Sequence, residues 1–326
     1  MFLRPKYRNN SRKSYVLAQG EHDSERSYSL AQEKGDPERS LSTPEENDCC
    51  GIEVWHVIAA ILHGVSFLFL LGLYLGNGEN AIKGILVNDT FVFDEKDIVL
   101  ERVAEYDLAL VLLPMPALTS LFHIIQAVLS RDVPTDQDLD WFENLQRRYM
   151  HAVKRGVNIV RWLEYSITAG LMTWIIAQLS GITNVYLTVL LAAVGNVTLQ
   201  CHGYLHERFF MDDKLAYKNW TNWIPFINGF VIFGGQWSIL LAYFISTVNA
   251  SGDSGVPWFV WVSFIGLISS FLLFPFVQIL YARRWLWVKN WFQYELAFII
   301  LSMVSKLLLD WTLFAGIIME REQKNQ

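Results

Sequence analysis

Apolar runs long enough to cross a bilayer recur along this chain, and they restrict it to one class of fold. A helix needs about 20 apolar residues to span the hydrocarbon core, where only helices and closed barrels satisfy every backbone polar group. Hydrophobic residues make up 52% of the 326 residues. The sequence therefore predicts an all-α membrane protein, a bundle of seven transmembrane helices. The predicted spans are 52–76, 107–130, 158–180, 184–205, 223–247, 257–281 and 291–318.

The distribution of lysine and arginine predicts the orientation of these helices. Cytoplasmic loops carry an excess of both residues. The segment before the first span and the loops after spans two, four and six together hold 19 of them, whereas the opposite side holds five. The amino terminus is therefore expected in the cytoplasm and the carboxyl terminus outside the cell.

The chain is expected to have three parts. Residues 1–50 are poor in apolar residues and rich in charged residues and serine, so they bury too little surface to fold alone and are predicted to be a disordered cytoplasmic tail. Residues 51–320 form the seven-helix domain. Residues 321–326 form a short extracellular tail.

A short extracellular β-hairpin is predicted between spans one and two. The apolar runs Ile85–Val87 and Phe91–Phe93 flank Asn88-Asp89-Thr90, a composition typical of a turn. A mobile loop is the alternative interpretation of the same segment.

Lys306 lies in the middle of the last apolar run, where a primary amine is energetically unfavourable. Charged residues inside a membrane span are costly and usually functional. Apolar residues separate Lys306 from both ends of its span, so its amine cannot easily reach the interface. Two explanations remain: a salt bridge, or covalent use of the amine as a Schiff base.

Glu164 in span three is the natural partner for Lys306. A carboxylate inside the membrane must find a cation or stay protonated. Arg161 is three residues away on the same helical face, and pairing of Glu164 with Arg161 alone is the competing explanation. His63 and His123 are further titratable groups in apolar runs. Together with the acid and the amine they indicate a buried network that holds protons.

These residues, taken together, resemble the heliorhodopsin family. The shared motifs are Arg-Trp-x-Glu-Tyr-Ser in span three, Leu-Phe-His in span two, Leu-His in span one and Ser-x-x-x-Lys in span seven. The resemblance extends over residues 52–318 and includes the inverted topology.

The resemblance implies a rhodopsin-like bundle that binds all-trans retinal on Lys306 as a protonated Schiff base, with Glu164 as its primary counterion. It assigns His63 and His123 to the network that handles the proton after photoisomerisation. It places Ser302 near the Schiff base. Thr119 and Asn196 are the remaining pocket residues that it implies.

Aromatic side chains are candidates for the walls of a pocket for the polyene, although most aromatic residues in membrane proteins serve packing or the interface. The candidates are Trp162, Tyr165, Trp174, Trp237, Trp261 and Phe264. Pro275 is expected to kink span six.

Asp310 departs from the family pattern, in which a small neutral residue is expected. It follows Lys306 by four residues, so it lies one turn outward on the same helical face. It is a candidate for an additional counterion, a proton acceptor or the mouth of a proton pathway. Glu105, Asp107 and Glu295 are candidates for extending a proton path, with solvated interfacial charge, or pairing of Glu295 with Arg284 or Lys289, as the alternative.

Two versions of a non-enzymatic photoreceptor therefore stay open: a light sensor, or a light-dependent proton transporter. The resemblance also implies a homodimer in the lipid bilayer that signals to a cytoplasmic partner, and nothing in the sequence indicates binding to nucleic acid. A third hypothesis is a retinal-free transporter or membrane enzyme with a Lys306–Asp310 ion pair. His202 and His206 have metal-ligand spacing but no third ligand, so they are expected to line the interface.

Overall fold

The computed structural model describes residues 45–76, 85–94, 97–133, 140–210, 216–252 and 255–324. The chain divides into two units, Met1–Pro44 and Glu45–Gln326, and everything described belongs to the second unit. The predicted tail at residues 1–50 therefore lies almost wholly outside the described residues. The first helix begins at Glu45, before the predicted first span.

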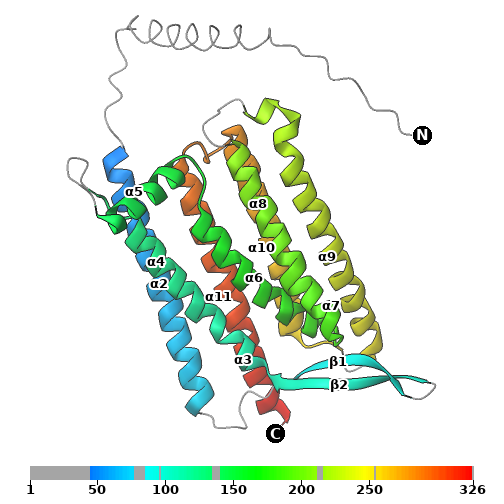
Figure 1. Ribbon diagram of the computed structural model, residues 1–326. Helices are drawn as coiled ribbons and strands as arrows, with labels where there is room; N and C mark the ends of the chain where they lie inside the picture. Colours follow the sequence, from blue (N-terminus) through cyan, green and yellow to red (C-terminus); the bar gives the residue numbers. More distant parts are fainter. Residues whose placement is uncertain are drawn as a thin grey trace, which may run out of the picture. The chain divides into compact units, whose positions relative to one another are not determined.

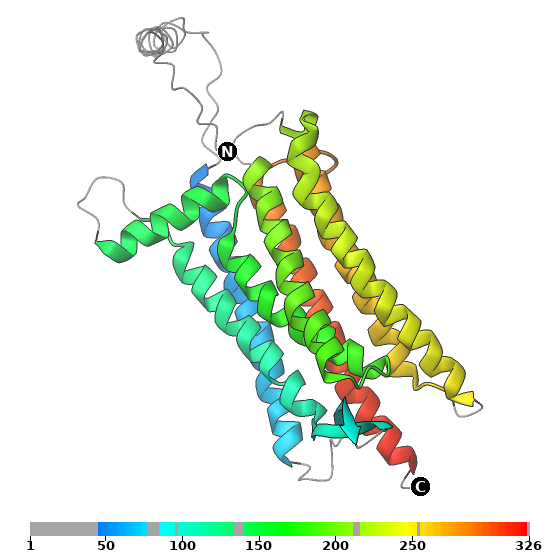
Figure 2. The same ribbon diagram turned by 45° about the vertical axis from the view of Figure 1, so that its right-hand side comes forward.

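Seven helical segments within the described residues run along a common bundle, which confirms the predicted fold (Figures 1 and 2). Several are built from more than one element. They are α2 (Glu45–Gly76); α3 (Leu108–Leu112) with α4 (Pro114–Leu129); α6 (Ile159–Leu179); α7 (Val185–Val189) with the π-helix η2 (Leu190–Gly195) and α8 (Asn196–Phe210); η4 (Trp220–Trp223) with α9 (Ile224–Ala250); α10 (Trp258–Arg283); and α11 (Trp291–Lys324).

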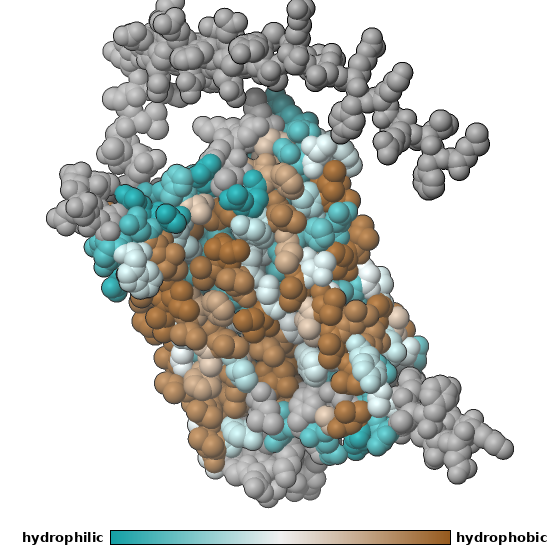
Figure 3. All heavy atoms as spheres, in the orientation of Figure 1, coloured by the Kyte–Doolittle hydropathy of each residue, from teal (hydrophilic) through white to brown (hydrophobic). Residues whose placement is uncertain are grey.

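The outer surface of the bundle is apolar, as expected for a protein that faces lipid. Five of the described helices are long and apolar enough to cross a membrane, and α4 is a shorter apolar helix. Large apolar side chains such as Leu68, 65% exposed, and Val231, 70% exposed, point outward. Figure 3 shows this hydrophobic belt, with hydrophilic side chains gathered toward the ends of the bundle. The chain is an integral, multi-pass membrane protein.

The predicted hairpin is present, but its turn lies elsewhere. Strands β1 (Ile85–Asp94) and β2 (Asp97–Asp107) pair antiparallel, and the last paired residues are Asp94 and Asp97. The predicted turn at Asn88–Thr90 is therefore wrong, because the register shifts between Asn88 and Asp89 and makes an irregularity inside β1 instead. The hairpin contacts the connection between α6 and α7, where the backbone N–H of Asp89 donates to Thr183 O at 2.8 Å.

Two acids that were expected at the end of span two lie in β2 instead. Glu105 is exposed and pairs with Arg102 at 3.2 Å, and Asp107 is the last residue of the strand. Both residues are therefore part of the hairpin, and the solvated-charge interpretation holds for Glu105.

Helix α5 (Trp141–Lys154) was not predicted; it lies at the end of the bundle opposite the hairpin (Figure 1). A capping box begins it: the Asp140 side chain accepts from Glu143 N at 2.7 Å, and the Glu143 carboxylate accepts from Asp140 N at 3.0 Å. Its buried face includes Tyr149, Met150 and Val153. Burial raises the pKa of Tyr149, so its phenol keeps the proton that it donates to Gln126 Oε1 at 3.5 Å. Helix α5 is therefore attached to the bundle core. We refer below to the α5 end and the hairpin end of the bundle.

Candidate functional site

Lys306 and Glu164 meet inside the bundle, on α11 and α6. The side chains are 3% and 1% exposed and form a buried ion pair. Gln126 Nε2 on α4 donates to the second Glu164 oxygen at 3.3 Å, and the Lys306 amine lies 5.3 Å from the ring centroid of Tyr165. The carboxylate thus receives both a cation and a hydrogen-bond donor, which a buried charge requires.

Arg161 does not pair with Glu164, contrary to the competing explanation. It is 3% exposed and binds two other carboxylates: Glu207 on α8, and Glu295 on α11 at 2.6 Å. The alternative interpretation, in which Glu295 pairs with Arg284 or Lys289, is therefore wrong. Instead, Arg284 Nη1 donates to the Lys289 carbonyl. We call Arg161, Glu207 and Glu295 the buried ion cluster.

Neutral side chains complete the buried ion cluster and connect it to the Lys306–Glu164 pair. Trp162 Nε1 and Tyr294 OH each donate to Glu207 at 2.7 Å. Asn158 Nδ2 lies 3.0 Å from both Glu295 Oε2 and Gln126 Oε1, and Gln126 in turn donates to Glu164. A continuous set of polar contacts therefore runs between the two ion-paired groups.

Glu207 was missed as a site residue, although a signal for it exists. It directly follows His206, so it projects from a different helical face than His202 and His206. However, Gln200, Gly203 and Glu207 recur at intervals of three and four residues, which places them on one helical face. Gln200 and Gly203 line the central cavity, so that face points into the bundle.

Three histidines, rather than the expected two, lie together between α2 and α4. The rings of His63 and His123 are stacked with centroids 6.0 Å apart, and His56 Nδ1 lies 3.0 Å from His123 Nδ1. All three are at most 2% exposed. His56 was missed, although it precedes His63 by seven residues, two helical turns on the same face.

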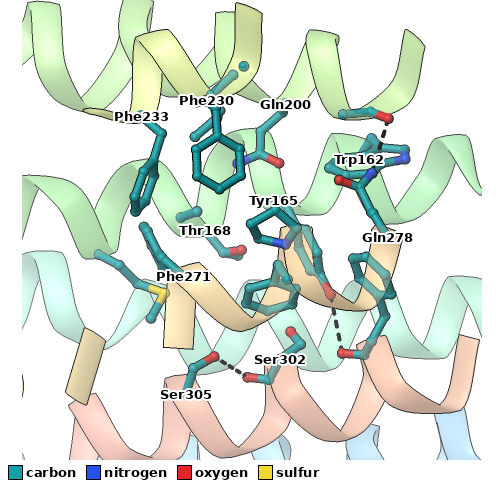
Figure 4. Close-up of a pocket in the computed structure, with 18 of the residues that line it drawn as sticks. Trp162, Tyr165, Thr168, Gln200, Phe230, Phe233, Phe271, Gln278, Ser302 and Ser305 are labelled. Atoms are coloured by element: carbon teal, nitrogen blue, oxygen red, sulfur yellow. Dashed lines mark hydrogen bonds between the residues drawn. The ribbon is translucent and has the colours of Figure 1, made fainter. Parts of the chain in front are cut away.

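An apolar cavity opens between α6, α8, α9, α10 and α11, with Lys306 in its wall. The space between its walls, together with the open space at its mouth, is about 780 Å³. Figure 4 shows Trp162, Tyr165, Phe230, Phe233 and Phe271 around it, with Ser302 and Ser305 on α11. Tyr165 OH donates to Phe298 O at 3.3 Å, which holds the ring in the wall.

Four of the predicted site residues line this cavity, and the others lie behind it. The four are Trp162, Tyr165, Ser302 and Lys306. Trp237 packs behind the wall, with ring centroids 5.9 Å from Phe233 and 5.8 Å from Phe271. Asn196 donates to the backbone oxygens of Tyr165 and Ser166, so it positions α6. The residues on the side of α2 and α4, or farther along α11, are His63, His123, Thr119 and Asp310.

The remaining aromatic candidates serve the packing of the bundle. Phe264 stacks on Phe244 at 4.2 Å between centroids, and Trp261 is 40% exposed at the surface. Trp174 is not among the residues that line the cavity. Pro275 does line it, and α10 continues from Trp258 to Arg283 through this proline.

Asp310 is buried but forms no ion pair with Lys306, which removes the support for the retinal-free hypothesis. Its side chain is 0% exposed. Within the described part of the chain neither of its carboxyl oxygens has a hydrogen-bond partner, while the Lys306 amine is engaged by Glu164.

The two histidines with metal-ligand spacing form no metal site. His206 is 2% exposed and packs among Phe210, Trp223 and Phe226, so the expectation that it lines the interface is wrong. The residues that the structure describes contain no group of three or more His, Cys, Asp or Glu side chains that could hold a metal ion.

The fold and the site define a class, that of the rhodopsin-like seven-helix membrane proteins. The chain is similar to the crystal structure of the transmembrane domain of Salpingoeca rosetta rhodopsin phosphodiesterase, with a TM-score of 0.57 and 13% identity, covering 86% of this chain and 90% of that one. A crystal structure of thermophilic rhodopsin also matches, with a TM-score of 0.48, 13% identity and coverage of 86% and 97%. A search of curated proteins found no match.

The family is shown by the sequence itself. The family model described as Heliorhodopsin matches residues 52–318. The chain therefore belongs to the heliorhodopsin family. Family and fold together support a retinal-based photoreceptor in general terms.

Proposed function

We propose that this protein is a light-absorbing photoreceptor that holds all-trans retinal on Lys306 as a protonated Schiff base, with Glu164 as the counterion. The observation that carries the proposal is the buried Lys306 amine, which lies in the wall of an aromatic cavity and is paired with a carboxylate from a neighbouring helix. Retinal supplies a conjugated polyene that absorbs visible light and isomerises.

The residues present fit such a group. Ligand pockets are mostly apolar with a few polar groups, and the walls of this cavity have that composition. Its walls are mainly aromatic, which suits a flat polyene. Trp162 is held in place by its hydrogen bond to Glu207, and Tyr165 by its bond to Phe298 O. Of the described residues in the wall, Lys306 is the one that carries a primary amine.

The chain's own residues account for the handling of charge. Glu164 stabilises a positive charge on the Lys306 nitrogen, and Gln126 keeps the carboxylate in place. A displacement of that charge from Glu164 weakens the pair, because the electrostatic energy falls with distance and is large in a low-dielectric interior. The proton can then pass to the histidines. His63 has two ring nitrogens, and His123 has Nε2, without a partner among the described residues.

The proposal includes the inverted orientation, with the amino terminus in the cytoplasm, because lysine and arginine favour that side. It also includes a homodimer that signals to a cytoplasmic partner. No enzymatic activity is proposed for this chain, since the phosphodiesterase in the name of the structural neighbour belongs to that protein.

Replacing Glu164 by glutamine tests the counterion. The Glu164→Gln protein is expected to lose much of its visible band at neutral pH in favour of a band at shorter wavelength. The reason is that a negative charge within about 4–6 Å favours the charged form of a group by about 1–3 pKa units, and its removal favours the unprotonated form of the Schiff base. The measurement is a pH titration of the absorption spectrum after purification with retinal. Glu105→Gln is the matched control, since Glu105 is exposed in the hairpin. Identical titrations of Glu164→Gln and wild type would exclude Glu164 as the counterion.

Light-dependent proton transport is the second candidate function, and buried Asp310 favours it. Two buried groups of residues favour the sensor: the buried ion cluster lies toward the α5 end, and the apolar side chains of Leu70, Met115 and Leu313 are fully buried toward the hairpin end. Cells that express the protein are therefore expected to show no steady photocurrent at any voltage. A steady current that disappears in Asp310→Asn would establish transport.

A further inference from the structure

The buried core of the bundle contains more carboxyl groups than cations. Among the described residues, its charged side chains are two cations, Arg161 and Lys306, and four carboxyls, Glu164, Glu207, Glu295 and Asp310. Burial of an unpaired ionised carboxylate is strongly unfavourable, so such a group usually takes up a proton. Glu164, Glu207 and Glu295 are all engaged by cations. Asp310 is the carboxyl without one, so it is the first candidate to hold a proton.

On the neighbouring helices α2 and α4, two buried hydroxyl groups also lack a hydrogen-bond partner among the described residues. Ser66 on α2 is 3% exposed and Thr119 on α4 is 0% exposed. Neither side-chain oxygen has a hydrogen-bond partner in the described ranges, nor do the two ring nitrogens of His63. Buried polar groups are nearly always satisfied, either by protein or by ordered water. Four such residues on three neighbouring helices therefore point to a common explanation.

Helical spacing places these residues in one layer. Ser66 lies three residues from His63, Thr119 four residues from His123, and Asp310 four residues from Lys306. In each case the step is one turn along the same face, and in each case it leads toward the hairpin end, since α4 runs opposite to α2 and α11.

Contacts one helical turn away on either side support the placement of Ser66, Thr119 and Asp310 at one level of the bundle. Toward the α5 end, the His63 and His123 rings are stacked. Toward the hairpin end, Leu70, Met115 and Leu313 each follow by one more turn, are 0% exposed and belong to one apolar cluster. The same level of α2 and α11 is also joined by the contact of Phe69 with Trp311, at 5.2 Å between centroids. Ser66, Thr119 and Asp310 are buried and lie between these layers, so the helix faces that carry them are at the same level of the bundle interior.

We propose that Asp310, Ser66, Thr119 and His63 surround a hydrated proton-binding site. In the resting protein Asp310 holds the proton, and water joins its carboxyl to the His63 imidazole. Transfer breaks the Asp310 O–H bond and forms an N–H bond on His63, so it needs no other reactant. The apolar cluster beyond the site keeps the proton inside the bundle. The protonation of Asp310 in the resting protein does not depend on retinal. Only the transfer of its proton after light absorption rests on the proposed function.

Infrared spectroscopy of the full chain in lipid, with and without retinal, tests the proposal. The wild type is expected to show the carbonyl-stretching band of a protonated carboxyl, and this band should disappear in Asp310→Asn and persist at a changed frequency in Asp310→Glu. Prolonged incubation in D₂O is expected to shift the band, since water reaches the site. Ser66→Ala and Thr119→Val are expected to change its frequency.

Ser270→Ala is the matched control, because the Ser270 hydroxyl is buried but bonds to Gly266 O of its own helix at 2.8 Å. It should leave the band unchanged. The proposal is overturned if Asp310→Asn removes carboxylate bands instead of a protonated-carboxyl band, or if the band of the wild type does not respond to D₂O. Because the band is also read in retinal-free protein, its absence is distinguishable from a failure of Lys306 to bind retinal.

Discussion

Alanine in place of Lys306 is expected to abolish the visible absorption band of protein purified with retinal, because among the described residues that line the cavity only Lys306 carries a primary amine. A Schiff base requires a primary amine, and the remaining side chains of the wall cannot form one. The measurement is an absorption spectrum after addition of retinal to membranes that contain equal amounts of folded protein. Lys289→Ala is the matched control, since Lys289 is exposed in the connection between α10 and α11.

The Lys306→Ala protein also leaves Glu164 buried without its cation, so loss of the band alone could reflect loss of folding. Reduction of the wild type with borohydride removes this ambiguity. The retinyl mass is expected on the α11 peptide that contains Lys306. A retinyl mass on any other peptide, or none, would contradict the proposed function.

Replacing Arg161 by glutamine is expected to lower the free energy of unfolding by about 3–5 kcal/mol, the usual cost of removing one partner from a buried ion pair. The substitution leaves Glu207 and Glu295 close together without a cation, whereas wild-type Arg161 contacts both. The measurement is equilibrium unfolding of retinal-free protein in mixed micelles with increasing SDS.

Arg131→Gln provides the comparison for this experiment. Arg131 pairs with Glu53 at 3.1 Å, but its side chain is 63% exposed, and exposed pairs contribute only about 0–1 kcal/mol. The triple variant Arg161→Gln, Glu207→Gln, Glu295→Gln should regain part of the lost stability, because it removes the uncompensated charges. If Arg161→Gln destabilises no more than Arg131→Gln, the buried ion cluster does not stabilise the fold.

The spans were predictable because apolar runs of bilayer length leave a chain few other structures. Helix α5 was not, since it is an amphipathic surface helix whose sequence contains no such run. The capping box at Asp140 and Glu143 was its available signal. The hairpin turn was misplaced because asparagine and aspartate suit an irregularity within a strand as well as a turn, and only the pairing of β1 with β2 decides between them.

The candidate site was predictable where a single charged residue is energetically unfavourable inside a membrane span. Lys306 and Glu164 each needed an oppositely charged partner there, and the structure brings them together. Ion pairs between residues far apart in the sequence were harder to predict. Glu295 pairs across the bundle with Arg161, 134 residues away in the sequence, rather than with the nearer cations Arg284 and Lys289. Glu207 and His56 were missed for the same reason, although their helical spacing was visible.

Helix α6 carries Glu164 and Arg161 one turn apart. Glu164 is bound to Lys306 of α11, and Arg161 to Glu207 of α8 and Glu295 of α11. A shift of α6 that weakens the Glu164 contact is therefore expected to act also on Arg161 and on Asn158, which directly precedes the helix. Asn158 contacts Gln126, which also accepts from Tyr149 of α5. A shift of α6 is thus expected to change the polar contacts that join the bundle interior to α5.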